Sequence, residues 1–199
     1  MAKWDNLLLF KKNSAEDYLK TAQNVAAWLK KYEVKKPVGK SWEIRSGAGS
    51  DEGDDLASKM TDRSIYSGAA GIGFFYIQLY EATDDKQYLD EAVEAAEYLL
   101  GTFQKELGVK PGIHGGITGE GFFAETLYQK TGEQKYRDYA IQVGDVAYET
   151  AVKEDGKIHW DNLVDYMGDG STAVYWLQLA EITGDQKYVT YAKELIDYI

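Results

Sequence analysis

Two kinds of hydrophobic pattern alternate along the chain. A nearly continuous apolar segment follows a glycine-rich turn, from Tyr66 to Thr83, and a segment with a single apolar stripe comes next, from Tyr88 to Phe103. Apolar residues in the second segment recur with a period near 3.6, as in an amphipathic helix: Tyr88, Leu89, Ala92, Val93, Ala96, Leu99, Leu100 and Phe103. The two segments predict a helical hairpin whose first helix is buried and whose second helix covers it.

This hairpin pattern is repeated along the chain. The end of the glycine turn and its two phenylalanines recur 48 residues later at Gly119–Phe123, and a looser copy follows at Gly168–Ala173. Each copy also has a leucine followed four residues later by a threonine: Leu79 and Thr83, Leu127 and Thr131, Leu179 and Thr183. A regular period of this length is typical of repeat architectures, in which neighbouring copies stack on one another.

We therefore expect an all-α chain of seven helices that forms one repeat domain over residues 1–199. Ser14 and Asp17 supply the N-cap of its leading helix, and alternating residues allow short strands at 41–45 and 157–160. The expected parts are hairpin units at 63–104, 112–152 and 164–199, a leading helix at 14–33 and a flexible loop at 37–62.

Glycine and aspartate mark both ends of the first helix in each hairpin. After the helix, Asp84, Gly132 and Gly184 suit the left-handed conformation that commonly ends a helix. Before the helix, glycines are expected to adopt positive φ and to let neighbouring helices approach closely. These structural turn glycines are Gly68, Gly71, Gly73, Gly116, Gly119, Gly121, Gly168 and Gly170.

Composition and charge disfavour several classes of function. The net charge of −11 disfavours binding to nucleic acid and to anionic membrane surfaces, because both depend on lysine and arginine. The chain has no cysteine, which excludes disulfides, thiolate chemistry and Cys-ligated zinc within it. It has neither a signal peptide nor an apolar run of about 18 residues, so we expect a cytoplasmic protein.

One stretch resembles the signature of lanthionine synthetase C-like proteins. It runs Tyr66-Ser-Gly-Ala-Ala-Gly-Ile-Gly73, with Leu79–Tyr80, Thr83–Asp84 and Tyr88–Leu89 after it, and the resemblance covers residues 63–199. It implies a partial α/α toroid, with glycine-rich turns opening inner helices around a central cavity. It also implies a cyclase that joins Cys thiols to dehydrated Ser or Thr on a peptide, using a zinc ion held by two Cys and one His.

The chain departs from the family at the positions that carry this chemistry. Its lack of cysteine leaves the zinc without ligands, so we expect no metal or other cofactor. The family's catalytic histidine directly precedes a Gly-Ile-x-Gly turn, whereas one extra glycine displaces His114. The family's catalytic aspartate would fall at Ser64, and the nearest acid is Asp62. The chain has about half the hairpins of a full toroid. We therefore expect a zinc-less relative of the cyclases or the N-terminal part of one, in which the remaining chain or a second copy completes the toroid.

Residues that could carry chemistry gather in the loops before the inner helices. Histidine transfers protons near neutral pH, and paired carboxylates can act as acid and base. The catalytic candidates are His114, His159, Asp161 and Asp169, and the candidates for ligand contact in the cavity are Trp42, Arg63, Tyr66, Glu120 and Trp160. Each also has a structural explanation: histidines can bind loop backbone, acids can cap helices, and tryptophans can anchor loops.

Three functions follow as hypotheses. The first is a lanthionine synthetase C-like protein that binds or modifies a peptide, with His114 as the proton carrier. The second is a non-catalytic binding or assembly module whose open ends pair with another chain. The third is a carbohydrate-active α/α enzyme that uses Asp161 or Asp169.

Overall fold

The computed structural model describes residues 14–42, 63–160 and 166–199. They fall into two compact units, Met1–Tyr32 and Glu33–Ile199. Seven α-helices lie within the described residues, so the all-α class and the expected helix count are confirmed. No helix in these ranges is long and apolar enough to cross a bilayer. The single domain predicted over residues 1–199 stays a prediction.

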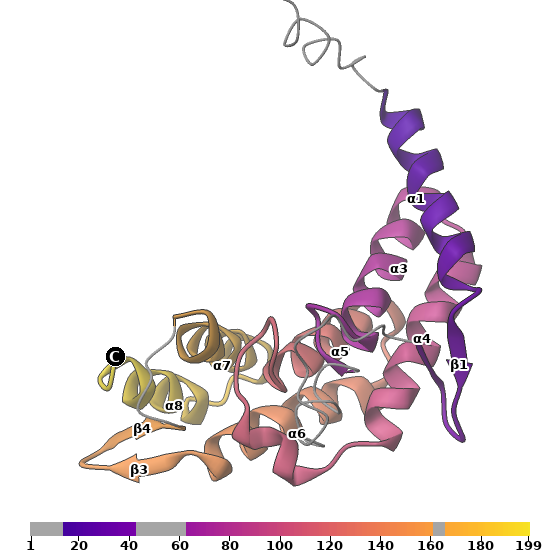
Figure 1. The fold of residues 1–199 in the computed structure, drawn as a ribbon. Helices are drawn as coiled ribbons and strands as arrows, with labels where there is room; N and C mark the ends of the chain where they lie inside the picture. Colours follow the sequence, from indigo (N-terminus) through magenta and orange to yellow (C-terminus); the bar gives the residue numbers. More distant parts are fainter. Residues whose placement is uncertain (1–13, 43–62, 161–165) are drawn as a thin grey trace, which may run out of the picture. The chain divides into compact units, whose positions relative to one another are not determined.

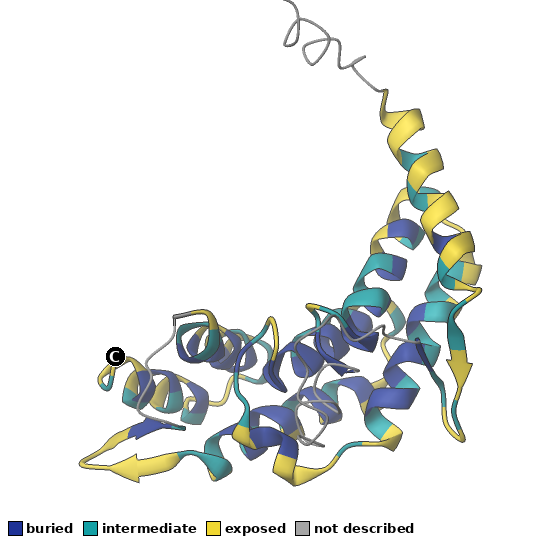
Figure 2. Ribbon diagram, in the orientation of Figure 1, coloured by how far each residue is buried: buried dark blue, intermediate teal, exposed yellow. Residues whose placement is uncertain are grey.

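The first unit contains helix α1 (Ala15–Leu29), and its N-cap is the predicted one. The Ser14 hydroxyl accepts a hydrogen bond from the Asp17 backbone N, and the Asp17 carboxylate accepts one from the Ser14 backbone N. This capping box satisfies two backbone donors that the helix itself leaves free. The helix surface is largely exposed within its unit, as the yellow ribbon in Figure 2 shows, and only Ala26 on it is buried.

The second unit consists of three consecutive helical hairpins (Figure 1). In each, the first helix packs along the second, and the first helices of successive hairpins contact one another. The second helix of one hairpin also packs against the first helix of the next. This arrangement confirms the partial α/α toroid. The hairpins are α3 (Ala69–Thr83) with α4 (Lys86–Gly101), α5 (Thr118–Thr131) with α6 (Gln134–Thr150), and α7 (Ser171–Thr183) with α8 (Lys187–Ile196).

Short strands and helical turns connect the hairpins. Strands lie at both expected places as members of antiparallel pairs, in which Glu33 faces Trp42 and Val152 faces His159. Residues 43–45 of the first expected strand lie outside the described residues. The turn between the two strands of the second pair contains Asp155 and Gly156, both with positive φ, as a tight two-residue hairpin requires. The connecting elements are β1 (Glu33–Lys35), β2 (Lys40–Trp42), the 3₁₀ helix η1 (Lys105–Val109), β3 (Val152–Glu154), β4 (Lys157–His159) and the π-helical turn η2 (Tyr166–Gly170).

The repeated leucine and threonine form the corner of each hairpin. The Thr83 hydroxyl donates to the Leu79 carbonyl at 2.7 Å and accepts from the Asp85 backbone N at 3.2 Å. The same two bonds occur in the other hairpins, at Thr131 and Thr183. The residues that follow these threonines, Asp84, Gly132 and Gly184, adopt the predicted left-handed conformation.

Glycines on the first helices accept an aromatic ring from the next hairpin. A methyl group at Gly73 would lie 2.2 Å from Phe123 Cζ, and one at Gly121 would lie 2.0 Å from Tyr175 Oη. Both aromatic side chains are fully buried, and buried residues are frequent where the hairpins meet (dark blue in Figure 2). The expectation of close helix approach therefore holds, but the turn glycines at 68–73, 116–121 and 168–170 do not have the positive φ that we also expected.

Candidate functional site

The turns that precede the three first helices lie next to one another. The Tyr66 backbone N donates to the His114 carbonyl at 2.8 Å, which joins the first turn to the second. The Ile113 backbone N donates to the Ser171 hydroxyl at 2.9 Å, which joins the second turn to the start of α7. Three segments far apart in sequence therefore form one surface at the amino-terminal ends of α3, α5 and α7.

Side chains of three different kinds are exposed on these turns. Tyr66 is 83% exposed, Met167 is 46% exposed, and His114 is also exposed. We call the surface formed by Tyr66, His114 and Met167 the turn face. Asp169 belongs to the third turn, but its side chain is buried. The structure thus brings together the turns that carry the predicted residues Tyr66, His114 and Asp169.

The other predicted histidine and the tryptophans are packed into the molecule. His159 at the end of β4 is buried, and its ring stacks on that of Tyr198 with centroids 4.3 Å apart. Trp160 stacks near Trp176, with centroids 5.9 Å apart. Trp42 on β2 is buried. These contacts give all three residues a packing role, and their predicted roles in catalysis or ligand contact stay predictions.

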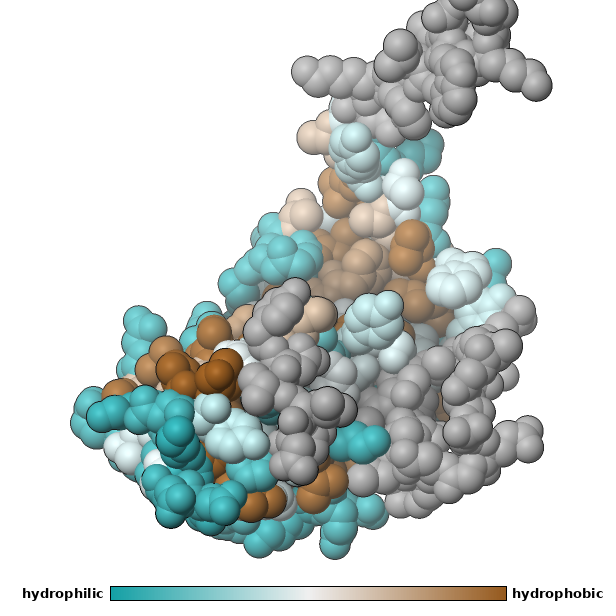
Figure 3. Space-filling view, turned by 60° about the vertical axis from the view of Figure 1, so that its left-hand side comes forward, coloured by the Kyte–Doolittle hydropathy of each residue, from teal (hydrophilic) through white to brown (hydrophobic). Residues whose placement is uncertain are grey.

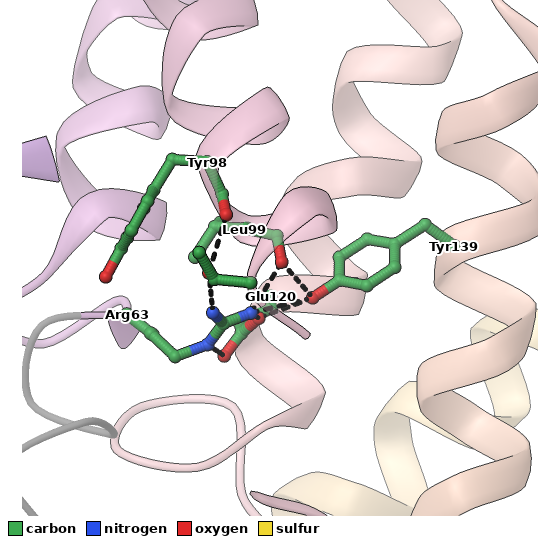
Figure 4. A network of polar contacts seen from close by, with 6 residues as sticks. Arg63, Tyr98, Leu99, Glu120 and Tyr139 are labelled. Carbon is green, nitrogen blue, oxygen red and sulfur yellow. Dashed lines mark hydrogen bonds and ion pairs between the residues drawn. The ribbon is translucent and has the colours of Figure 1, made fainter. Parts of the chain in front are cut away.

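Arg63 and Glu120, both predicted as cavity residues, form a buried ion pair (Figure 4). Arg63 is 2% exposed and Glu120 is 0% exposed. The guanidinium binds both carboxylate oxygens, with Nε 2.7 Å from Oε1. This two-pronged geometry is the strongest that an arginine and a carboxylate can form.

Neighbouring helices complete the network around this pair. The guanidinium also donates to the Leu99 carbonyl at 2.7 Å and to the Thr102 hydroxyl at the end of α4. The Tyr139 hydroxyl on α6 donates to the Glu120 carboxylate. The network therefore joins the segment before α3 to α4, α5 and α6, and so connects the first two hairpins.

The electrostatics favour the charged form of Arg63 and the neutral form of Tyr139. Burial alone lowers the pKa of Arg63, but the adjacent Glu120 charge and its hydrogen bonds raise that pKa above its ordinary value. Burial, with the Glu120 charge, raises the pKa of Tyr139 well above its ordinary value. Tyr139 is therefore a stable hydrogen-bond donor. Because a ligand could reach Arg63 or Glu120 only by opening this network, ligand contact by either residue stays a prediction.

Two residues that the sequence reasoning missed face a cavity between α5 and α7. Glu125 is only 6% exposed, and the Oε1 atom of Gln178 is buried without a hydrogen-bond partner among the described residues. A signal for Glu125 exists in the repeat, since the equivalent positions in the other hairpins are Ile77 and Leu177. A single acid at an otherwise apolar repeat position indicates a local departure from simple packing.

The remaining predicted acid, Asp161, lies outside the described residues. Among the residues that are described, no three His, Asp or Glu side chains are close enough to hold a metal ion. A catalytic carboxylate role for Asp161 or Asp169 in carbohydrate chemistry stays a prediction.

Comparison with known proteins places this geometry in context. Residues 59–199 match the family model described as lanthionine synthetase C-like protein. A search of curated proteins finds no significant match.

Two glycoside hydrolases are among the similar solved structures. One is a family 76 enzyme (mannosidase) from Bacteroides thetaiotaomicron VPI-5482, 16% identical with a TM-score of 0.46, for which the match covers 90% of this chain and 70% of that one. The other is a family 76 enzyme from a bovine Bacteroides thetaiotaomicron strain, with the same identity and TM-score. There the match again covers 90% of this chain but 55% of that one.

Proposed function

Because the chain belongs to the lanthionine synthetase C-like family, we propose that it binds a peptide across the turn face. The observation that supports this is the meeting of three turns, which exposes Tyr66, His114 and Met167 together. Tyrosine offers a large apolar ring with a polar tip, and methionine adapts its shape to varied partners. Both suit an extended peptide.

His114 is the candidate for proton transfer in any modification of the bound peptide. An imidazole changes its charge near neutral pH, and this one is open to solvent at the amino-terminal side of α5. The resemblance in sequence supports the same residue, displaced by one position from the family's catalytic histidine.

The residues of this chain do not fit the zinc ion that the family's cyclases use. The sequence has no cysteine, and the second histidine, His159, is buried against Tyr198. We therefore propose a role in which this stretch of chain acts without a cofactor of its own, in the cytoplasm.

Binding can be tested by fluorescence anisotropy with labelled peptides that are rich in Ser, Thr and Cys. Tyr66→Ala should weaken a peptide that binds by about tenfold or more, as expected for a central aromatic contact. The matched control is Tyr18→Ala, which removes another exposed tyrosine, on α1, and should leave the affinity unchanged. Equal loss in both variants, or no binding by any peptide, would refute the proposal.

Modification can be tested separately by mass spectrometry of the bound peptide after thiol alkylation. If His114 transfers a proton, His114→Asn should abolish the change in peptide mass while leaving peptide affinity intact. A variant that still modifies the peptide at the same rate would remove His114 from the proposal without affecting the binding result.

A second function is favoured by apolar side chains at the surface of the last hairpin. Val174, Leu177, Ile196 and Ile199 are all exposed. Figure 3 views the molecule from the side of this hairpin, where brown apolar areas interrupt the hydrophilic surface. Apolar patches of this kind are typical of interaction sites. We propose, as the alternative, an assembly module that meets a second copy or further chain here. Sedimentation should then show a dimer that Leu177→Asp dissociates.

A further inference from the structure

A cavity of about 380 Å³ lies between α5 and α7, away from the turn face. Its walls come from residues 122–129 of α5 and 178–182 of α7, whereas the turns lie before the first residues of these helices. The residues that carry the argument are Phe122, Glu125 and Gln129 on α5 and Gln178, Glu181 and Ile182 on α7. A volume of this size is within the usual range for small-molecule sites.

The cavity holds a buried carboxylate and one buried amide oxygen to which no described residue donates. Glu125 is 6% exposed, and its Oε1 accepts a hydrogen bond from Gln129 Nε2. Gln178 Oε1 is buried, and no described residue donates to it. Glu181 adds a second, exposed carboxylate at the rim. Buried acceptors without donors cost free energy, so the cavity is suited to a ligand that brings donors and positive charge.

The electrostatics agree with this description of the cavity. Burial raises the pKa of Glu125, the hydrogen bond from Gln129 partly offsets that rise, and the charge of Glu181 adds to it. A bound cation would relieve both the loss of solvation and the repulsion between the two carboxylates. The net charge of −11 also favours the approach of cations.

The shape of the donor set distinguishes between cations. No group of three metal-ligating side chains occurs in the part of the chain that the structure describes, and two of the polar residues here are carboxamides, so an organic cation fits better than a metal ion. A guanidinium presents five N–H donors in a flat fork, which can reach a carboxylate and an amide oxygen together. Its flat face can lie on the ring of Phe122, and the attached alkyl chain can lie along Ile182.

We propose that the cavity between α5 and α7 binds a guanidinium group, with Glu125 and Gln178 as its principal acceptors. Glu181 contributes charge at the rim. The ligand is an arginine side chain or a small guanidine compound, which share this chemistry. The site is independent of peptide binding at the turn face.

The test is a titration of the whole chain with N-acetyl-arginine amide, followed by amide NMR shifts. We expect saturable binding that moves the signals of α5 and α7, and at least about tenfold weaker binding of the citrulline analogue, which has the same shape without the charge. The lysine analogue should also bind more weakly. Equal binding of all three analogues, or no saturation by the arginine probe, would overturn the proposal.

Substitutions test whether the probe binds in the cavity and not at the turn face. Glu125→Gln and Gln178→Met should each weaken the arginine probe by about tenfold, because each removes an acceptor from the cavity. Gln78→Met is the matched control, since Gln78 occupies the equivalent repeat position on α3 outside the cavity, and it should leave affinity unchanged. Tyr66→Ala should also leave the probe bound. If Gln78→Met weakens binding as much as Gln178→Met, the assigned cavity is wrong.

An arginine-containing peptide distinguishes the two sources of the guanidinium. A peptide that binds more tightly than the free amide, and still loses affinity in Glu125→Gln, identifies a peptide side chain as the ligand. Equal affinity of the two probes identifies a small guanidine compound.

Discussion

Replacing Arg63 with methionine is the most informative test of the fold. The change keeps a long apolar stem but removes the cation that faces a fully buried carboxylate. Glu120 would keep the hydrogen bond from Tyr139 and lose both bonds from the guanidinium. The carbonyl of Leu99 and the hydroxyl of Thr102 would each lose a charged donor as well.

The expected cost follows from the burial of the pair. Removing one partner of a buried ion pair destabilises a protein by about 3–5 kcal/mol, because the other charge is left without compensation. Domains of this size are stable by about 5–15 kcal/mol, so Arg63→Met should remove a large part of the free energy of unfolding. A midpoint shift of about 2–4 °C per kcal/mol then predicts a fall of about 6–20 °C in Tm.

Urea and thermal unfolding followed by far-UV circular dichroism measure this change directly. Lys105→Met is the matched control, because Lys105 pairs with Glu149 on the surface and its loss should leave Tm almost unchanged. The double variant Arg63→Met with Glu120→Leu should be more stable than Arg63→Met alone, because no unpaired charge remains. A cost below about 1 kcal/mol for Arg63→Met, or a double variant less stable than the single one, would refute the reasoning.

Three further changes test other parts of the fold. Gly121→Ala should cost about 1–3 kcal/mol, because its methyl group would displace the buried Tyr175 hydroxyl from 2.0 Å away. Thr131→Val should cost about 0.5–1.5 kcal/mol by removing the hydroxyl that accepts from the Glu133 backbone N. Glu125→Gln should stabilise the chain at neutral pH, since burial raises the pKa of this carboxyl above its ordinary value of 4.5. A carboxyl whose pKa is higher in the folded state than in the unfolded state destabilises the fold as the pH rises from the unfolded-state pKa through the folded-state pKa. The gain from removing it should therefore vanish below about pH 4.

Each of these three changes has a comparison that can contradict it. Gly115→Ala adds a methyl group with no neighbour within 4 Å and should be nearly neutral. Thr126→Val removes a hydroxyl that donates only along its own helix, so it should cost less than Thr131→Val. For Glu125→Gln, chemical unfolding across the acid range gives the answer, and a gain that stays constant with pH would show that the carboxyl is not the cause.

The hairpin plan could be predicted from the sequence because it depends on local patterns. An apolar stripe with a period of 3.6 specifies a helix and its buried face, and a left-handed residue after Thr83 or Thr131 ends that helix. Strand β3 was missed because its three residues are all exposed and only one of them, Val152, is apolar, which is too few to show an alternating pattern. The Asp155–Gly156 pair is typical of a two-residue turn between antiparallel strands and would have indicated β3.

The internal arrangement of the site could be predicted less well. Arg63 and Glu120 were both selected as candidates, but their pairing joins residues 57 positions apart and depends on how two hairpins pack. Nothing in the local sequence of either residue indicates the other. The burial of His159 and Trp42 depends in the same way on the short sheets, whose packing against the helices no local pattern specifies.

A comparison between the repeats would have singled out Glu120 and Glu125. Glu120 stands where the other hairpins have Ile72 and Thr172, and Glu125 stands where they have Ile77 and Leu177. The burial of the equivalent residues differs, because Ile77 and Thr172 are buried whereas Ile72 is half-buried and Leu177 is 46% exposed, so the repeat singles out the two acids but does not fix their burial. A buried carboxylate needs a partner. Glu120 has the guanidinium of Arg63 as that partner, whereas Glu125 has only a neutral carboxamide among the described residues. In the second hairpin, the acid at position 120 therefore has its partner within the chain, whereas the acid at position 125 is left open to the external cation that we propose.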